Sequence, residues 1–136
     1  MYTDINHKLL NGKLVITAKK EGNICTSTRI TTKNKKEFQY GRFEARAKLP
    51  VGHGIWPAFW MLGLNISEVG WPKSGEIDIL EYLAREPQMV FTNLHPQESH
   101  GHSINTKKTK ISDIEKGFHV YALDWSKNKM DFFIDD

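Results

Sequence analysis

The fold is decided by one stretch of sequence, Gly75-Glu76-Ile77-Asp78-Ile79-Leu80-Glu81-Tyr82. It resembles a buried β-strand in its apolar residues, yet it also carries three acids. Carboxylates are rare on such a strand, because an unpaired buried charge is costly. The stretch therefore predicts a strand with one apolar face and a second face that carries carboxylates.

The three acids share one face only if the strand is irregular. Glu76 and Asp78 are two positions apart and lie on the same face of a regular strand. Glu81 is five positions from Glu76 and would point the opposite way. A one-residue β-bulge around Ile79-Leu80 would restore Glu81 to the face of the other two acids. We therefore expect all three carboxylates to project into one groove.

Three carboxylates in one groove suit the hydrolysis of a glycosidic bond. That reaction needs a nucleophile or base and a proton donor on either side of the bond. Glu76 and Glu81 could approach the roughly 5–5.5 Å carboxyl separation of retaining enzymes. Asp78 would orient the nucleophile and keep the two glutamates in different protonation states. A solvated acidic edge strand has the same spacing, so spacing alone leaves both interpretations open.

Three tryptophans, Trp56, Trp60 and Trp71, lie within twenty positions before Glu76. Aromatic platforms offer sugar rings a large contact area at low entropic cost, so this clustering favours the groove interpretation. Trp60 fits a core position as well. Trp71, in a Gly-Trp-Pro loop, is harder to explain as packing, whereas Trp125 is more typical of a core residue.

Alternation with period two dominates the rest of the chain and predicts an all-β sandwich or barrel. The clearest case is Phe38–Leu49, where apolar residues fall on one face and Arg42, Glu44 and Arg46 on the other. Only Ser112–Lys116 indicates a helical turn. Further strands are expected at Lys13–Lys19, Ile24–Thr31, Trp56–Leu62, Gly75–Tyr82, Met89–Leu94, Phe118–Asp124 and Met130–Ile134.

Composition limits the other classes of function. The 136 residues suffice for one domain, and a net charge of +3 with interleaved signs excludes the strong basic field of a dedicated nucleic-acid binder. We interpret the lysine clusters at 33–36 and 107–110 as solvated loops. Cys25 is the only cysteine, so no intrachain disulfide can form. We expect a monomer.

No apolar run approaches the length needed to span a membrane, and no leader sequence follows Met1. Either the protein stays inside the cell or the chain is a mature or partial one. The chain stops on a strand pattern at Phe132–Asp136, which would leave an unpaired sheet edge. We therefore expect a domain that is truncated.

Histidines His95, His100 and His102 follow the expected strand Met89–Leu94. Their spacing matches no structural zinc pattern, so we assign no metal ligands. We expect His95 to lie next to the substrate or the acid/base residue instead.

The combined motifs resemble glycoside hydrolase family 16, in the form of the laminarinase-like endo-β-1,3-glucanases. The resemblance spans nearly the whole chain. It rests on residues 40–50 (YGRFEARAKLP), 54–63 (GIWPAFWMLG), 71–72 (WP) and 75–82 (GEIDILEY), with further similarity at 11–18 and 118–125.

This resemblance implies a β-jelly roll with a long cleft and retention of configuration by double displacement. It implies Glu76 as nucleophile, Asp78 as its supporting acid and Glu81 as acid/base, in the bulged form of laminarinases. It implies sugar contacts by Trp56, Trp60 and Trp71, by Glu44 and Arg46, and by His95. The substrate would be β-1,3-glucan, laminarin-like or with mixed 1,3;1,4 linkages. A non-catalytic glucan-binding relative is the alternative.

Two expectations depend on segments that the family has and this chain lacks. Residues 1–136 would form a partial catalytic domain with weak or no activity alone. A structural calcium, which terminal segments of the family bind, has no assignable ligands here, and catalysis would require no cofactor. The family also implies an extracellular or periplasmic location.

Overall fold

The computed structural model describes residues 1–99, 102 and 105–135. Almost all its regular structure is β. The elements, in chain order, are β1 His7–Leu10, β2 Lys13–Ile16, β3 Lys19–Glu21, β4 Ile24–Thr26, β5 Gly41–Ala47, β6 Ala58–Leu62, α1 Ile66–Val69, β7 Glu76–Tyr82, β8 Met89–His95, the 3-10 helix η1 Gln97–Ser99, β9 Lys107–Lys110, β10 His119–Trp125 and β11 Met130–Ile134.

The chain divides into two compact units, Met1–Glu37 and Phe38–Asp136. The first unit consists of two antiparallel hairpins, β1-β2 and β3-β4. The amide of Asn6 donates to the Thr26 hydroxyl at 2.8 Å, and a parallel bridge joins Tyr2 to Ser27. Few apolar side chains are covered within this unit, and Leu9 is 82% exposed.

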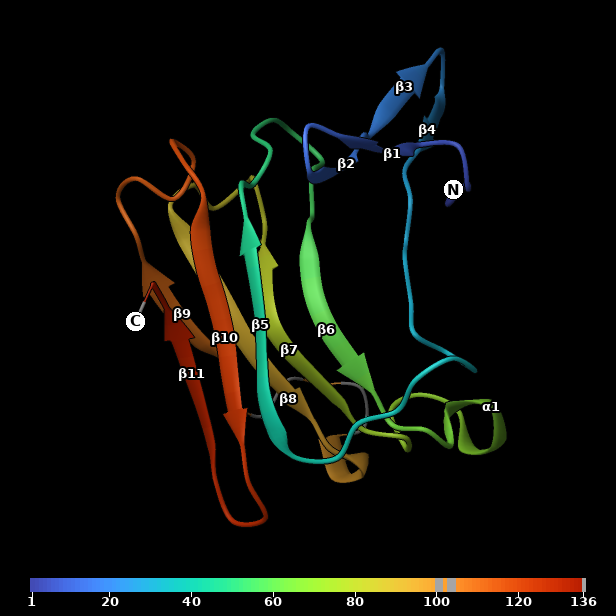
Figure 1. Cartoon of the computed structure of the whole chain (residues 1–136), viewed down its shortest axis with the longest axis vertical. Helices are drawn as coiled ribbons and strands as arrows, with labels where there is room; N and C mark the ends of the chain where they lie inside the picture. Colours follow the sequence, from blue (N-terminus) through green and yellow to red (C-terminus); the bar gives the residue numbers. More distant parts are fainter. Residues whose placement is uncertain (100–101, 103–104, 136) are drawn as a thin grey trace. The chain divides into compact units, whose positions relative to one another are not determined.

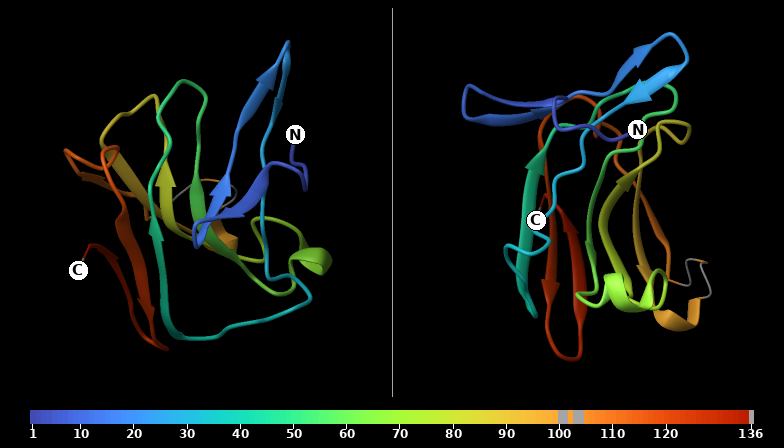
Figure 2. Two further views of the ribbon diagram at one scale, coloured as in Figure 1. Left: turned by 45° about the horizontal axis from the view of Figure 1, so that its top comes forward. Right: turned by 90° about the vertical axis from the view of Figure 1, so that its right-hand side faces the viewer.

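The second unit contains two antiparallel sheets, with strand orders β11-β10-β5 and β6-β7-β8-β9. Figure 1 shows both sets of strands, and the right-hand view of Figure 2 shows them as two layers. The core lies between the layers and draws on both sheets. Its members are Leu49, Ile79, Leu80, Tyr82, Val90, Ile114, Tyr121 and Leu123.

Alternation within each strand decides which side chains enter this core. On β5, Phe43 and Ala47 pack against the core, while Arg42, Glu44 and Arg46 remain exposed. On β10, Tyr121 and Leu123 are fully buried, and Trp125 packs against the core as expected. The outer face of each sheet is therefore available to polar residues.

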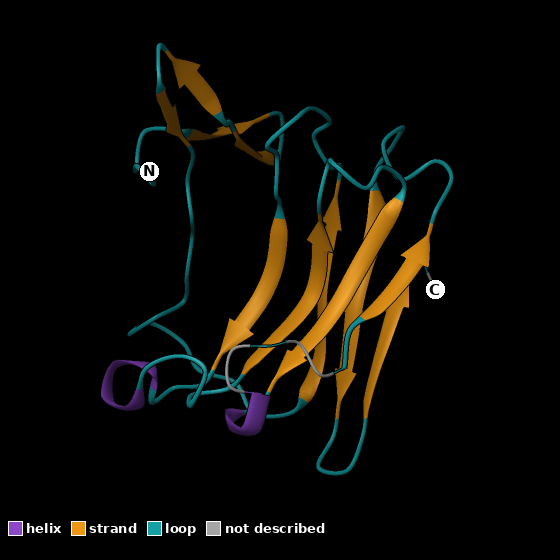
Figure 3. Cartoon of the chain, turned by 180° about the vertical axis from the view of Figure 1, so that it is seen from behind, coloured by secondary structure: helices purple, strands orange, loops and turns teal. Residues whose placement is uncertain are grey.

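Several local predictions are wrong. Residues Lys107–Lys110 form edge strand β9 rather than a loop, and their lysines suit an edge because charge discourages pairing with another chain. Strand β1 was missed. Residues Ser112–Lys116 form turns, and the short helices are α1 and η1, which Figure 3 shows at the same end of the strands. The 33–36 lysines do lie outside regular structure.

Candidate active site

The expected β-bulge is present in β7. Against β8, Asp78 pairs with Asn93 and Glu81 pairs with Phe91, so three steps along β7 match two steps along β8. The extra residue reverses the alternation within β7. Glu76, Asp78 and Glu81 therefore share the outer face of the sheet, while the apolar residues of β7 fill the core.

The register with β6 locates the extra residue. Phe59 pairs with Leu80 and Trp60 pairs with Asp78, so Ile79 has no partner on β6. Opposed residues of an antiparallel pair lie on the same face. Trp60 therefore lies on the face of the acids, whereas its neighbour Phe59 packs against the core. Trp60 is thus placed beside the acids and not in the core cluster.

Glu76 is held at the end of the acid face by a loop tryptophan. The indole Nε1 of Trp71 donates to Glu76 Oε2 at 2.6 Å. The Trp71 ring also lies 5.7 Å from the His95 ring, centroid to centroid. His95 is the cross-strand partner of Glu76, and its Nε2 lies 3.3 Å from Asp78 Oδ2. The structure thus brings His95 next to Glu76 and Asp78.

Glu81 receives hydrogen bonds from both sides of β7. The indole Nε1 of Trp56 donates to Glu81 Oε1 at 2.9 Å, and Asn93 Nδ2 donates to Glu81 Oε2. The Thr106 hydroxyl in turn donates to Asn93 Oδ1 at 2.6 Å. Each glutamate is thereby oriented by its own indole N–H, and Glu81 has an additional amide donor.

Burial and mutual repulsion govern the charges of these acids. Asp78 is only 4% exposed, and burial together with the nearby charges of Glu81 and Glu76 raises its pKa to about 8. Burial also raises the pKa of Glu81, opposed by hydrogen bonds from Trp56 and Asn93. At neutral pH Asp78 is therefore mostly protonated. It can hydrogen-bond Glu76 without adding a second negative charge beside it.

Glu44 and Arg46 do not join this site, so that part of the sequence prediction is wrong. They lie on β5, which belongs to the other sheet, and both are exposed on its outer face. Glu44 pairs with Arg42 at 3.0 Å, and the Arg46 guanidinium lies over the Phe118 ring. The alternation of β5 correctly identified its polar face, but that face is turned away from the acids.

The loop that carries Trp71 is closed at its base. Gly63 N donates to Gly75 O at 3.2 Å, which joins the end of β6 to the start of β7. A Cβ at position 63 would lie 1.9 Å from Ser74 O, so only glycine fits there. Trp56 and Trp71 themselves are 64% and 48% exposed. Their ring faces remain accessible while their N–H groups contact the glutamates.

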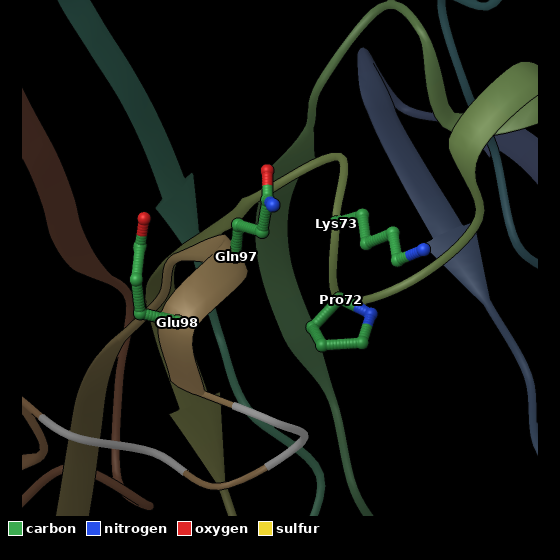
Figure 4. Close-up of a pocket in the computed structure, with 4 residues that line it drawn as sticks. All are labelled: Pro72, Lys73, Gln97 and Glu98. Atoms are coloured by element: carbon green, nitrogen blue, oxygen red, sulfur yellow. The ribbon is translucent and has the colours of Figure 1, made fainter.

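An open pocket of about 350 Å³ lies beside this loop. Figure 4 shows its four lining residues, Pro72 and Lys73 from the loop and Gln97 and Glu98 from η1. Three of them carry polar side chains that can form hydrogen bonds. Its lining residues come shortly after Trp71 and His95 in the sequence, but none of the three acids lines it.

Within the described ranges, no cluster of three or more His, Cys, Asp or Glu side chains could hold a metal ion. His102 is exposed, and His100 lies outside the described residues. In the same part of the chain, no helix is long and apolar enough to span a membrane.

Sequence reasoning missed two residues of the site, Asn93 and Thr106. Asn93 is 5% exposed in the middle of β8, and an amide on a buried strand is itself a signal because it needs partners there. Thr106 gives no such signal. Its contact depends on the pairing of β8 with β9, which the sequence pattern did not predict.

Comparison with known proteins identifies the family of the chain. The model of glycosyl hydrolases family 16 matches residues 1–136. A crystal structure of a laminarinase from Flavobacterium sp. UMI-01 superposes with a TM-score of 0.95 at 72% identity, over 98% of this chain and 58% of that one.

Curated relatives are also similar. A glucan endo-1,3-beta-glucosidase of Cryptopygus antarcticus is 39% identical over 99% of this chain and 54% of its own length. A beta-1,3-glucan-binding protein of Penaeus monodon is 40% identical over 84% of this chain and 34% of its own length.

These matches show an all-β protein with the jelly-roll fold of the laminarinases, as the sequence predicted. The chain belongs to glycosyl hydrolases family 16. It spans about half the length of the curated relatives that it matches.

Proposed function

We propose that this chain carries the catalytic carboxylates of a retaining endo-β-1,3-glucanase. The substrates are laminarin-like β-1,3-glucans and, as a second class, glucans with mixed 1,3;1,4 linkages. One observation carries the proposal: the bulge in β7 brings Glu76, Asp78 and Glu81 to one face, and a separate indole N–H holds each glutamate.

In the proposed mechanism Glu81 protonates the glycosidic oxygen while Glu76 attacks the anomeric carbon from the opposite face. The bond to the leaving sugar breaks, and a glycosyl ester on Glu76 forms. Glu81, now ionised, takes a proton from water as the water attacks the ester, and the configuration is retained. Asp78, protonated near neutral pH, donates a hydrogen bond to Glu76 and so orients the nucleophile.

The raised pKa of Glu81 supports its role as the acid. A general acid works best when its pKa lies near the working pH, and burial moves Glu81 in that direction. Trp60 and the exposed rings of Trp56 and Trp71 are the proposed sugar platforms, with His95 close to the scissile bond. Relatives described as laminarinases and endo-1,3-beta-glucosidases support the choice of β-1,3-glucan.

A non-catalytic glucan-binding protein is the alternative, and the relative from Penaeus monodon favours it. Such a protein would need only the aromatic groove. The three acids argue against it, because an acid as buried as Asp78 lowers stability and contributes nothing to binding a neutral glucan.

Reducing-sugar release from laminarin separates the two functions. A protein that contains the whole family domain should hydrolyse laminarin with retention, seen as the β-anomer in the first products by NMR. Residues 1–136 alone should show weak or no activity. Glu76→Gln should abolish turnover and leave laminarin affinity within about threefold, since it removes only the nucleophilic oxygen. Binding of laminarin without any cleavage by a protein that contains the whole family domain would disprove the enzymatic function.

Three further properties belong to this proposal. The two-carboxylate chemistry requires no cofactor, so treatment with EDTA should leave kcat unchanged; a calcium ion would act on stability. The protein acts as a monomer, which light scattering can test. It acts outside the cytoplasm, because a long glucan does not cross membranes, and cell fractionation can test this location.

A further inference from the structure

The geometry points to Asn93 as a positioning residue that holds the Asp78 and Glu81 carboxyl groups in one arrangement, with Thr106 fixing the orientation of its amide. This inference rests on the proposed roles of the two acids. Nothing in the motif around Glu76 requires an amide at this position, which lies on the neighbouring strand.

The bulge is what lets one amide contact both acids. Asn93 lies directly opposite Asp78, and the next described pair on β7 is Glu81 with Phe91. The bulge therefore turns Glu81 back toward the same amide. Asn93 Nδ2 donates to Glu81 Oε2 and also hydrogen-bonds the Asp78 carboxyl.

An asparagine amide can face its neighbours with either its NH₂ or its oxygen. Here the Thr106 hydroxyl donates to Asn93 Oδ1, so the NH₂ faces the carboxyl groups. Asn93 is also 5% exposed, so water cannot replace the contact at low cost. If the amide were reversed, its oxygen would face Glu81, which favours protonated Glu81 over ionised Glu81.

The expected consequence is electrostatic. Burial raises the pKa of Glu81, and the charge of Glu76 adds to this, while hydrogen bonds from Trp56 and Asn93 and the charge of His95 oppose the rise. Asp78 on β7 and His95 on β8 also face this carboxyl. From β9, Lys108 is directed to Glu86 instead. Asn93 thus opposes burial, so that Glu81 can give up its proton in the first step and act as a base in the second.

The test uses Asn93→Ala and Thr106→Val, each measured in two ways. A ¹³C-detected NMR titration follows the Glu81 carboxyl in the free protein, and kcat/KM on laminarin is measured against pH. Asn93→Ala should raise the Glu81 titration midpoint and the alkaline limb of the profile by about one pH unit. Thr106→Val should shift both in the same direction by less.

The matched control is Thr109→Val. Thr109 lies on β9 opposite Val90, one position from Lys108 and on the other face from Thr106 by alternation. It loses the same hydroxyl without touching the amide, so it should leave both midpoints unchanged.

Midpoints that do not move in folded Asn93→Ala and Thr106→Val would overturn the inference, whatever happens to the rate. If Asn93→Ala fails to fold, the Thr106→Val midpoint decides the question alone. Failure of the proposed function looks different: the wild type would not cleave laminarin at any pH, while the Glu81 titration in the free protein would still test Asn93.

Discussion

Strands β5 and β7 share one sequence pattern, charged residues alternating with apolar ones, but hold their charges in opposite physical states. On β5, Arg42 is 43% exposed and lies between two carboxylates, Glu44 and Asp124. On β7, Asp78 is 4% exposed and has two other acids beside it. Alternation thus identifies a polar face, whereas burial of like charges distinguishes a site from a solvated surface.

The two arrangements of charge also differ in their contribution to the stability of the folded protein. Exposed, mutually paired charges such as those of β5 contribute little either way. Buried acids that repel each other reduce stability, and a protein tolerates them where their perturbed protonation serves chemistry. The same kind of substitution should therefore have very different effects on activity and stability in β5 and in β7.

The largest expected effect is on turnover. Glu81→Gln removes the proposed proton donor and should lower kcat on laminarin about 10²–10⁴-fold. The same change on β5, Glu44→Gln, should leave kcat within twofold. Glu81→Gln should lose less activity on an aryl laminarioside than on laminarin, because the aryl leaving group needs no proton. Equal losses in the two variants would contradict the division between the two faces.

Asp78→Asn should change the pH dependence of stability. The pKa of Asp78 rises from 3.8 to about 8 on folding, so the folded protein keeps a proton that the unfolded chain releases. Wild-type stability should therefore fall as pH rises through this window, by up to about 1.4 kcal/mol per pH unit.

Asp78→Asn lacks this titration, so its advantage over the wild type in urea unfolding should grow from pH 5 to pH 8. The matched control is Asp124→Asn, beside β5, which should change stability by no more than about 0.5 kcal/mol. An advantage that stays constant with pH would show that Asp78 is ionised throughout.

A smaller effect is expected from the indole that holds Glu76. Trp71→Phe keeps a ring but removes the N–H donor, and should lower kcat/KM about tenfold. Trp125→Phe makes the same exchange at the core side of β10 and should reduce stability with kcat/KM nearly unchanged. If the two variants have the same kinetics, Trp71 acts by stacking alone.

The smallest effect concerns β10 and the residue that follows β11. His119 Nδ1 lies 2.7 Å from Asp135 Oδ2, and this contact raises the pKa of His119 and lowers that of Asp135. The pair is therefore charged and stabilising between these two pKa values. Because Asp135 is half exposed, His119→Gln should cost less than about 1 kcal/mol near pH 6.

This cost should shrink as pH rises through the raised pKa of His119, because neutral histidine loses the ionic contact in the wild type too. It should also shrink in acid, as pH falls through the pKa of Asp135. Urea unfolding at pH 4, 6 and 9 checks both limbs. A cost that does not vary with pH would mean that His119 contributes only packing.

Local patterns predicted much of the fold, because alternation and turn residues depend on neighbours in the chain. Strand β11 matches its expected range, and the bulge could be inferred because Glu81 otherwise faces the core. What could not be inferred depends on pairing between distant segments. Alternation predicted that Glu44 and Arg46 share the polar face of their strand, but not which sheet that strand joins. The lysine-rich sequence of β9 does not indicate a strand, because β9 depends on its pairing with β8.

The same limit applies to the site. The acids and tryptophans are recognisable by type and spacing, whereas the link from Thr106 through Asn93 to Glu81 joins three strands or their flanks. A threonine just before a strand gives no distinctive signal in the sequence. Its contact with the buried amide can be recognised only from the register of the two strand pairs.

The closure at Gly63 has a consequence for how such proteins diversify. Because Gly63 N donates a hydrogen bond to Gly75 O, the segment between them is a loop whose two ends lie close together. Residues 64–70 can therefore lengthen, shorten or be exchanged without altering the register of β6 with β7. New loops could change the surface beside the acids while the sequence and pairing of β7 stay intact.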